Sequence, residues 1–199
     1  VLDLITAFSV PSLPDNCFDA AQDPIPLCSC GDLQRMSEDV GAHYELRNDI
    51  DCFDTVHWDD GDGGVAEGFN PINPFNGVFD GQGYVIRNLN INRPNTDYVG
   101  LFGKTESNAF IGDVGLEGGD IKGWEFVGGL VGQSDGVISG SYTSGEVGGS
   151  SHVGGLAGRS EGDISDSYAI VDVTGDGEYA GGLAGQSGGD ISDSYASGS

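Results

Sequence analysis

The sequence is poor in positive charge, and this shortage limits the partners that the protein can bind. Only 7 of 199 residues are lysine or arginine, against 32 aspartates and glutamates, which gives a formal net charge of −25. Such a surface repels the phosphates of nucleic acids and anionic membrane headgroups. We therefore expect no nucleic-acid partner, and an acidic surface that attracts cations or forms a solvated coat in high salt.

Long apolar runs are also missing. No stretch reaches the ~18 apolar residues that a membrane helix needs, so we expect no membrane span. The sequence contains no Asn-x-Ser/Thr sequon, and it starts at Val1 without a methionine or a basic leader. This start indicates an exported chain whose signal peptide has been removed, located outside the cell or on its surface.

Cysteine is confined to one end, at Cys17, Cys28, Cys30 and Cys52. An even number in an exported chain predicts two disulfides. A bond between Cys28 and Cys30, two positions apart, would be strained, which favours cross-pairings with Cys17 and Cys52. A zinc site is the alternative, although Cys28 and Cys30 lack the usual ligand spacing.

Glycine, by contrast, is abundant, with 36 residues and no Gly-X-Y period, which excludes collagen. The stretch "GGLAGRSEGDISDSYA" (154–169) recurs as "GGLAGQSGGDISDSYA" (181–196). Four apolar columns keep a period of 26–29 residues: Leu101, Leu130, Leu156 and Leu183; Ile111, Ile138, Ile164 and Ile191; Tyr142, Tyr168 and Tyr195; Ile121, Val147 and Val173. Columns that share one period indicate a repeat architecture.

The repeat unit alternates with period two, which is typical of strands. In "VISGSYTSG" (137–145), Ile138 and Tyr142 fall on one face, and Ser139 and Ser141 fall on the other. This pattern predicts an all-β parallel β-solenoid of about six coils, with the apolar columns stacked inside the tube. The tyrosine column is thus expected inside, and Ser141, Ser167 and Ser194 are expected outside as a polar column.

Less regular coils precede the glycine-rich repeats. "HYELRNDIDC" (43–52) and "FNGVFDGQGYVIRNLNINRP" (75–94) alternate as strands do, with Val78, Tyr84 and Ile86 on the apolar face of the second. Residues 59–77, which contain Pro71 and Pro74, are predicted to be a long loop. Residues 29–40 predict a short helix that begins with a capping box and covers the edge of the first coil.

These segments together resemble the GLUG-motif repeat proteins. The resemblance is carried by "HYELRNDIDC", "FNGVFDGQGYVIRNLNINRP" and "YVGLFG", followed by "VGGLVG" and "VGGLAG", and it covers about residues 25–199. It implies a right-handed parallel β-solenoid on a secreted or surface-exposed bacterial or archaeal protein, in adhesin-like or filament-like settings. We therefore divide the chain into an N-terminal extension (1–24), a disulfide-containing cap with the first coil (25–60), and the solenoid with its glycine-rich repeats (61–199).

Candidate metal ligands lie in the acidic segments. Asp60 and Asp62, in "DDGDGG", offer alternate carboxylates for Ca²⁺ on a glycine-rich loop, although the full twelve-residue calcium-loop pattern is absent. Aspartates also recur at equivalent positions of successive repeats, as Asp163 with Asp190 and as Asp166 with Asp193. Each row either faces solvent or holds divalent cations. No spacing of histidine, serine and aspartate predicts a catalytic triad, and no other cofactor is expected.

The resemblance and the composition together predict a non-catalytic, exported structural or adhesive protein, with a cell-surface or glycan ligand. The apolar, strand-prone residues 1–10 lead us to expect head-to-tail assembly into a filament, in which they extend the last coil of another copy. The alternatives are a carbohydrate-active β-helix enzyme, which would show converging carboxylates in a cleft, and a Ca²⁺-dependent binding module.

Overall fold

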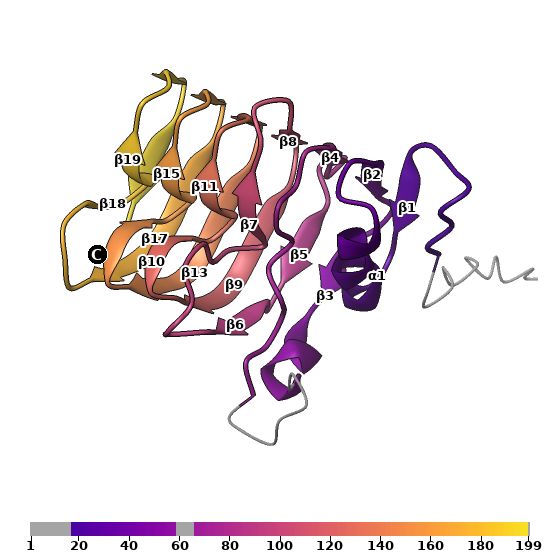
Figure 1. Cartoon of the computed structure of the whole chain (residues 1–199), viewed down its shortest axis with the longest axis horizontal. Helices are drawn as coiled ribbons and strands as arrows, with labels where there is room; N and C mark the ends of the chain where they lie inside the picture. The colour runs from indigo at the N-terminus through magenta and orange to yellow at the C-terminus, as the bar shows by residue number, and fades with distance from the viewer. Residues whose placement is uncertain (1–16, 59–65, 199) are drawn as a thin grey trace, which may run out of the picture.

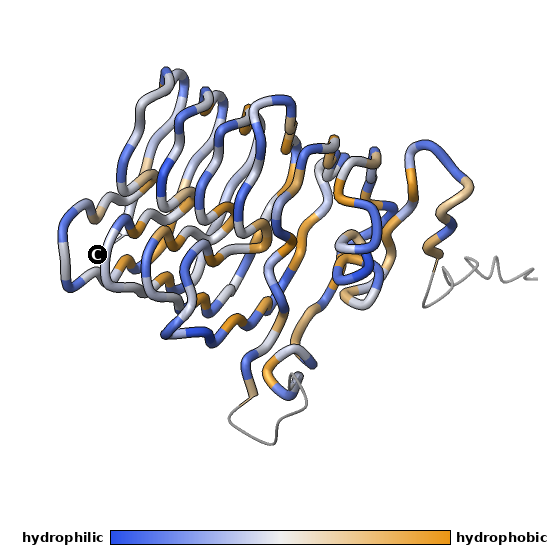
Figure 2. Tube along the Cα trace, in the orientation of Figure 1, coloured by the Kyte–Doolittle hydropathy of each residue, from blue (hydrophilic) through white to orange (hydrophobic). Residues whose placement is uncertain are grey.

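The computed structural model describes residues 17–58 and 66–198, and it is a parallel β-solenoid, as predicted. The coils stack along the longest axis of the molecule, with the N-terminal cap at one end and the last coil at the other (Figure 1). Apolar residues recur at the same place in each coil, on strands that line the interior (Figure 2). Four sheets, called here sheets I to IV, form the walls of this stack; sheets I and II extend to the N-terminal end, whereas sheets III and IV begin at Phe102 and Glu125.

Sheet I contains seven parallel strands in the order β1 (Ile25–Leu27), β2 (His43–Leu46), β4 (Val78–Asp80), β8 (Phe110–Gly112), β12 (Val137–Ser139), β16 (Ile164–Ser165) and β20 (Ile191–Ser192). Sheet II contains β3 (Ile50–Asp51), β5 (Val85–Arg87), β9 (Gly115–Lys122), β13 (Tyr142–Gly149), β17 (Tyr168–Gly175) and β21 (Tyr195–Ser197), and β6 (Asn90–Asn92) also pairs with β9. Sheet III is formed by β7 (Phe102–Thr105), β11 (Val131–Ser134), β15 (Ala157–Ser160) and β19 (Ala184–Ser187), and sheet IV by β10 (Glu125–Gly128), β14 (Ser151–Gly154) and β18 (Ala180–Gly181).

The coils that start at β7, β11 and β15 each visit sheets III, I, II and IV in turn, and the last coil starts at β19 and is described as far as β21 in sheet II. The coils before β7 are less regular, so about four turns are regular, whereas about six coils were predicted from the sequence. Strand register aligns the predicted columns: Ile138 pairs with Ile111 and Ile164, and Ile164 pairs with Ile191. A residue of one coil therefore stacks on its equivalent in the next.

The leucine and isoleucine ladders are fully buried except in the last coil. Leu130, Leu156 and Ile164 are wholly inaccessible to solvent, whereas Leu183 is partly buried and Ile191 is 46% exposed. The reason is that β20 is the final strand of its sheet, so no further rung covers that side. The leucine and isoleucine ladders are thus confirmed as the core.

A disulfide-linked cap covers the N-terminal end (Figure 1). Helix α1 (Cys30–Arg35) begins with the predicted capping box of Ser29 and Asp32, and a short 3₁₀ helix, η1 (Met36–Glu38), continues it. The α-helix is thus shorter than the predicted 29–40. Disulfides join Cys17 to Cys28 and Cys30 to Cys52, so the cross-paired arrangement is confirmed in place of the zinc alternative.

The segment before β4 is not simply the long loop that was predicted. Phe69, Ile72 and Phe75 are completely buried, and Ile72 and Phe75 form isolated parallel bridges to β7. Their amides donate to the carbonyls of Leu101 and Lys104, so this segment forms an irregular rung beside sheet III. Pro71 and Pro74 directly precede the donating residues, which is how a segment containing two prolines still pairs with a sheet.

The corner between sheets I and II reverses the side-chain alternation, and this overturns part of the predicted pattern. Gly140 has φ of +60°, so the next residue, Ser141, points inward and is fully buried, while Tyr142 points outward. The Ser141, Ser167 and Ser194 column is therefore internal, and it is structural: the Ser167 and Ser194 hydroxyls accept the backbone N–H groups of Ser141 and Ser167, both at 3.1 Å.

The apolar face of β4 and β5 also differs from the prediction. Phe79, not Val78, is fully buried on β4, and Tyr84 is 37% exposed. Ile86 is buried as expected. Register pairs Phe79 with Tyr44 and Ile111, which places it on the interior column of sheet I.

A second 3₁₀ helix, η2 (Phe53–His57), follows β3 and leaves Phe53 61% exposed. Trp58, directly after it, stacks on Phe69 with 6.1 Å between ring centroids. Trp58 therefore packs against the core, while Trp124, at the corner after β9, is 49% exposed.

Candidate functional site: the outer columns of the solenoid

The outer surface of sheet II carries a stack of tyrosine rings. Tyr142, Tyr168 and Tyr195 lie in register on β13, β17 and β21. The ring centroids are 4.8 and 5.0 Å apart and the ring planes are within 2–3° of parallel. The predicted tyrosine ladder therefore exists, but on the outside, with Tyr195 57% exposed.

A chain of charged contacts continues this stack toward the cap. The Tyr142 hydroxyl donates to Glu117 at 2.8 Å, and Arg87 bridges Glu117 and Asp49 at 3.2 and 2.8 Å. Burial raises the pKa of Tyr142 to about 12, with a further contribution from its hydrogen bond to the Glu117 carboxylate. Hydrogen bonding to Arg87 lowers the pKa of Asp49.

Carboxylates form a second column on the same outer face. Asp120, Glu146 and Asp172 are paired in register on β9, β13 and β17. A shallow hollow of about 320 Å³ is lined by the carboxylates of Asp120, Glu146 and Asp176, by Lys122, and otherwise by glycines and short side chains. Lys122 forms an ion pair with Asp120 at 3.0 Å. The column thus lies on an open surface rather than in a closed cleft.

The aspartates at the corner after sheet I have a structural explanation. Asp113, Asp166 and Asp193 have φ of +51°, +50° and +47°, and the equivalent position in the coil between Asp113 and Asp166 is Gly140. Aspartate and glycine tolerate this left-handed conformation better than most residues. The repeated aspartates therefore form the turn, and the predicted row at 166 and 193 is exposed on its outside. Asp163 and Asp190 are linked by a hydrogen bond from the Asp190 backbone N–H to Asp163 Oδ1 at 3.0 Å.

A four-ring stack, called here the corner stack, was missed by the sequence analysis; two of its members, Phe126 and His152, are the second residues of β10 and β14 in sheet IV. Tyr98, Phe126, His152 and Tyr179 each have positive φ, between +53° and +65°. Their centroids are 5.0, 4.5 and 4.7 Å apart along the stack. The signal was present, since these residues are spaced 28, 26 and 27 apart, but the mixture of tyrosine, phenylalanine and histidine concealed the column.

The outer face of sheet III carries cations and amides. Register aligns Lys104, Gln133, Arg159 and Gln186 in one column. Gln133 donates to Asp135 at 3.0 Å, and Arg159 donates to Glu161 at 2.7 Å. This column therefore presents both hydrogen-bond donors and hydrogen-bond acceptors to solvent.

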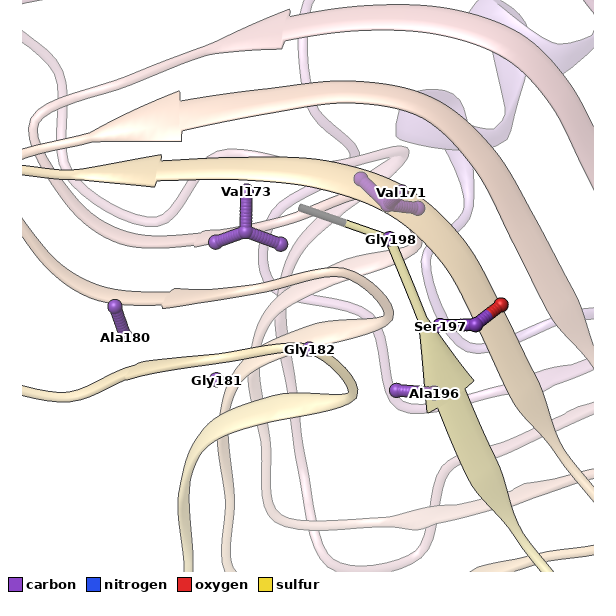
Figure 3. Close-up of a pocket in the computed structure, with 8 residues that line it drawn as sticks. All are labelled: Val171, Val173, Ala180, Gly181, Gly182, Ala196, Ser197 and Gly198. Carbon is purple, nitrogen blue, oxygen red and sulfur yellow. The ribbon is translucent and has the colours of Figure 1, made fainter.

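The last coil is open to solvent. A hollow of about 270 Å³ lies between β17 and β18 of the preceding coil and β21 of the last one, lined by Val171, Val173, Ala180, Gly181, Gly182, Ala196, Ser197 and Gly198 (Figure 3). Its apolar walls continue the interior of the tube.

The predicted metal ligands Asp60 and Asp62 lie outside the described residues. Within residues 17–58 and 66–198, no group of three or more histidines, cysteines, aspartates or glutamates is arranged to hold a metal ion. The histidines are dispersed: His43 lies 3.6 Å from Asp23, and His152 lies within the corner stack. Among the described helices, none is long and apolar enough to cross a membrane.

Comparison with known proteins identifies the repeat. Residues 149–174 and 176–199 match the sequence profile of the GLUG motif, so the resemblance is confirmed. The chain is similar to halomucin of Haloquadratum walsbyi, with 34% identity over 128 residues, which is 60% of this chain and 1% of halomucin. It is also similar to a proposed Gly-rich membrane protein of Evansella cellulosilytica, with 36% identity over 105 residues, 49% of this chain and 12% of that protein. The chain thus spans only a small part of either relative.

A solved structure supports the fold. A crystal structure of a Bacteroides ovatus protein, proposed to be an immunoglobulin A1 protease, superimposes with a TM-score of 0.56 at 19% identity, covering 89% of this chain and 68% of that one. At this identity the similarity concerns the fold alone.

Proposed function

We propose that this GLUG-motif protein is a rigid, non-catalytic segment of a protein displayed on the cell surface, where its outer columns mediate adhesion. The observation that carries the proposal is the regularity of these columns. Aromatic and acidic side chains repeat in register on the outer face of sheet II, and cations alternate with amides in register on the outer face of sheet III. A ligand that is itself a repeating polymer would meet the same kind of group at regular intervals along each column.

The geometry favours adhesion over catalysis. The hollow beside Asp120 and Glu146 is shallow, and these carboxylates belong to a long row rather than to an isolated converging pair. Glycosidases position two carboxyl groups on opposite sides of the scissile bond, which a single flat row does not do. The names of the relatives, halomucin and a Gly-rich membrane protein, agree with display at a cell surface.

Two assays on neutral polysaccharides test the proposal: one measures binding and the other measures cleavage. The purified chain is incubated with a panel of soluble neutral glycans, and affinity electrophoresis and reducing-end release are measured in parallel. Retardation without release supports an adhesive role. Release of reducing ends would overturn the non-catalytic assignment, and binding that EDTA abolishes would favour the Ca²⁺-dependent alternative.

We further propose that copies of the chain associate head to tail, with residues 1–10 of one copy against the last coil of another. Strands β19, β20 and β21 are each the final member of their sheet, so each has one unpaired edge. Together with the apolar hollow bordered by Val171 and Val173, these edges accept an added strand by main-chain hydrogen bonding (Figure 3). A contact of this kind joins two different surfaces of the chain, so each added copy leaves a free surface for the next one. Unless the copies form a closed ring, such contacts build a filament.

Sedimentation of the 199-residue chain alone tests this assembly. A further coil in a longer chain would cover the same edge, so the chain must be studied without one. We expect concentration-dependent polymers that disappear when residues 1–10 are deleted. A chain that stays monomeric at high concentration, or polymers that survive the deletion, would remove this proposal.

A further inference from the structure

The N-terminal cap buries a carboxylate that is only half satisfied. Asp32 is 1% exposed. Its Oδ2 accepts the backbone N–H groups of Cys28 and Ser29 at 3.0 and 3.1 Å, as its place in the capping box requires. Its Oδ1 is buried and has no hydrogen-bond partner. One oxygen of this carboxylate thus serves the helix, and the other has no donor among residues 17–58 and 66–198.

Asn48 carries a second buried oxygen without a hydrogen-bond partner among the described residues, and, like Asp32, it hydrogen-bonds to Cys28. Asn48 donates from Nδ2 to the carbonyl of Cys28 at 3.1 Å and to that of Asp49 at 2.5 Å. These two bonds orient the amide, and they leave Asn48 Oδ1 buried without a partner. Asp32 Oδ2 accepts the N–H of Cys28 and Asn48 Nδ2 donates to its C=O, so both side chains that carry an unpaired oxygen are bound to one residue of the disulfide-linked cap.

Two arginines near the cap form their ion pairs with other carboxylates, although Arg35 still attracts Asp32 electrostatically. Arg35 pairs with Glu38 at 3.1 Å and lies over the Phe18 ring, and Arg47 pairs with Glu45. Asp32 takes part in no ion pair with the described residues. A buried, unpaired carboxylate is costly unless a counter-charge accompanies it.

We propose that a small hard metal cation, Na⁺ or Ca²⁺, binds between Asp32 and Asn48 and completes the cap. Carboxylate and amide oxygens are the ligands that such cations prefer. A water molecule could hydrogen-bond both oxygens, but it would leave the carboxylate charge uncompensated. The cation satisfies the oxygens and the charge together, beside both disulfides. This site is separate from Asp60 and Asp62, and it does not depend on an adhesive function.

Thermal unfolding of the whole disulfide-bonded chain tests the site. Melting temperatures are compared in NaCl, in CaCl₂ and in choline chloride at equal ionic strength, because choline is too large to enter. We expect a metal salt to raise the melting temperature by about 2–4 °C over choline, the shift for a ligand present at several times its Kd in a chain of this size.

Three variants assign that shift to the cap. Asp32→Asn keeps an acceptor for the two backbone N–H groups but removes the charge, and it should lose the metal-specific shift. Asn48→Asp adds a second carboxylate but removes the two amide hydrogen bonds, so its melting temperatures are compared between salts within the variant, where the shift in CaCl₂ should exceed that in NaCl. Asp97→Asn, at an exposed aspartate, is the matched control for the loss of one surface charge and should keep the wild-type shift.

The opposite results would overturn the proposal. Equal melting temperatures in choline and in both metal salts would mean that no cation binds. A shift retained in Asp32→Asn would place the cation elsewhere on the acidic surface. An Asp32→Asn protein at least as stable as wild type in every salt would show that a hydrogen-bond donor, not a metal, fills the gap.

Discussion

Phe126 tests whether the corner stack compensates for an unfavourable backbone conformation. Its φ is +56°, and its ring stacks between Tyr98 and His152 at centroid distances of 5.0 and 4.5 Å. The left-handed region costs a residue with a Cβ atom about 1–2 kcal/mol. Glycine adopts the same conformation without that cost.

The two substitutions Phe126→Ala and Phe126→Gly separate the ring from the backbone. Both remove two ring contacts, each contributing about 0.5–1.5 kcal/mol, so alanine should lower the free energy of unfolding by about 1–3 kcal/mol. Glycine loses the same contacts and about 0.5–1 kcal/mol more through the entropy of the unfolded chain. It regains about 1–2 kcal/mol from the relieved backbone. We therefore expect the glycine variant to equal or exceed the alanine variant in stability.

Urea unfolding followed by circular dichroism measures this comparison. Thr174, an exposed residue of β17 with an ordinary strand conformation, provides the matched pair Thr174→Ala and Thr174→Gly. There the glycine variant should be the less stable by about 0.5–1 kcal/mol. If the difference between glycine and alanine is the same at both sites, the corner residues carry no backbone strain and the reasoning fails.

Three further results are expected. Ile164→Ala should cost about 2–5 kcal/mol, and Ile191→Ala, in the same ladder but 46% exposed, clearly less; equal losses in urea unfolding would contradict the burial of the ladder. Because the pKa of Tyr142 is raised to about 12, its contribution to stability should be complete below about pH 10 and lost as the pH rises toward 12. Glu117→Gln should lower that pKa in a tyrosinate absorbance titration, and an unchanged value would exclude the Glu117 carboxylate as a cause. Native mass spectrometry should find no free thiols, and reduction of the disulfides, which close loops of 11 and 22 residues, should lower stability by about 3 kcal/mol per bond; stoichiometric alkylation before reduction would contradict this.

The periodicity of the sequence was sufficient to predict the architecture. Equivalent positions 26–29 residues apart can stack in register only if each repeat forms one coil, so the leucine and isoleucine ladders followed directly from the spacing. Local chemistry was equally informative at the cap. Ser29 and Asp32 specify the start of α1 through contacts within four residues, and the short separation of Cys28 and Cys30 excluded a bond between them.

Tertiary structure decided which way side chains point beyond each corner. A strand pattern of period two holds only while the backbone stays extended, and the left-handed residue at Gly140 or Asp166 interrupts it. Ser141 therefore enters the core and Tyr142 leaves it, although uninterrupted alternation predicts the reverse. The same applies to contacts between distant segments. The buried segment at Phe75 pairs with β7, a contact that no local pattern predicts, and the rings of the corner stack come together only because successive coils stack.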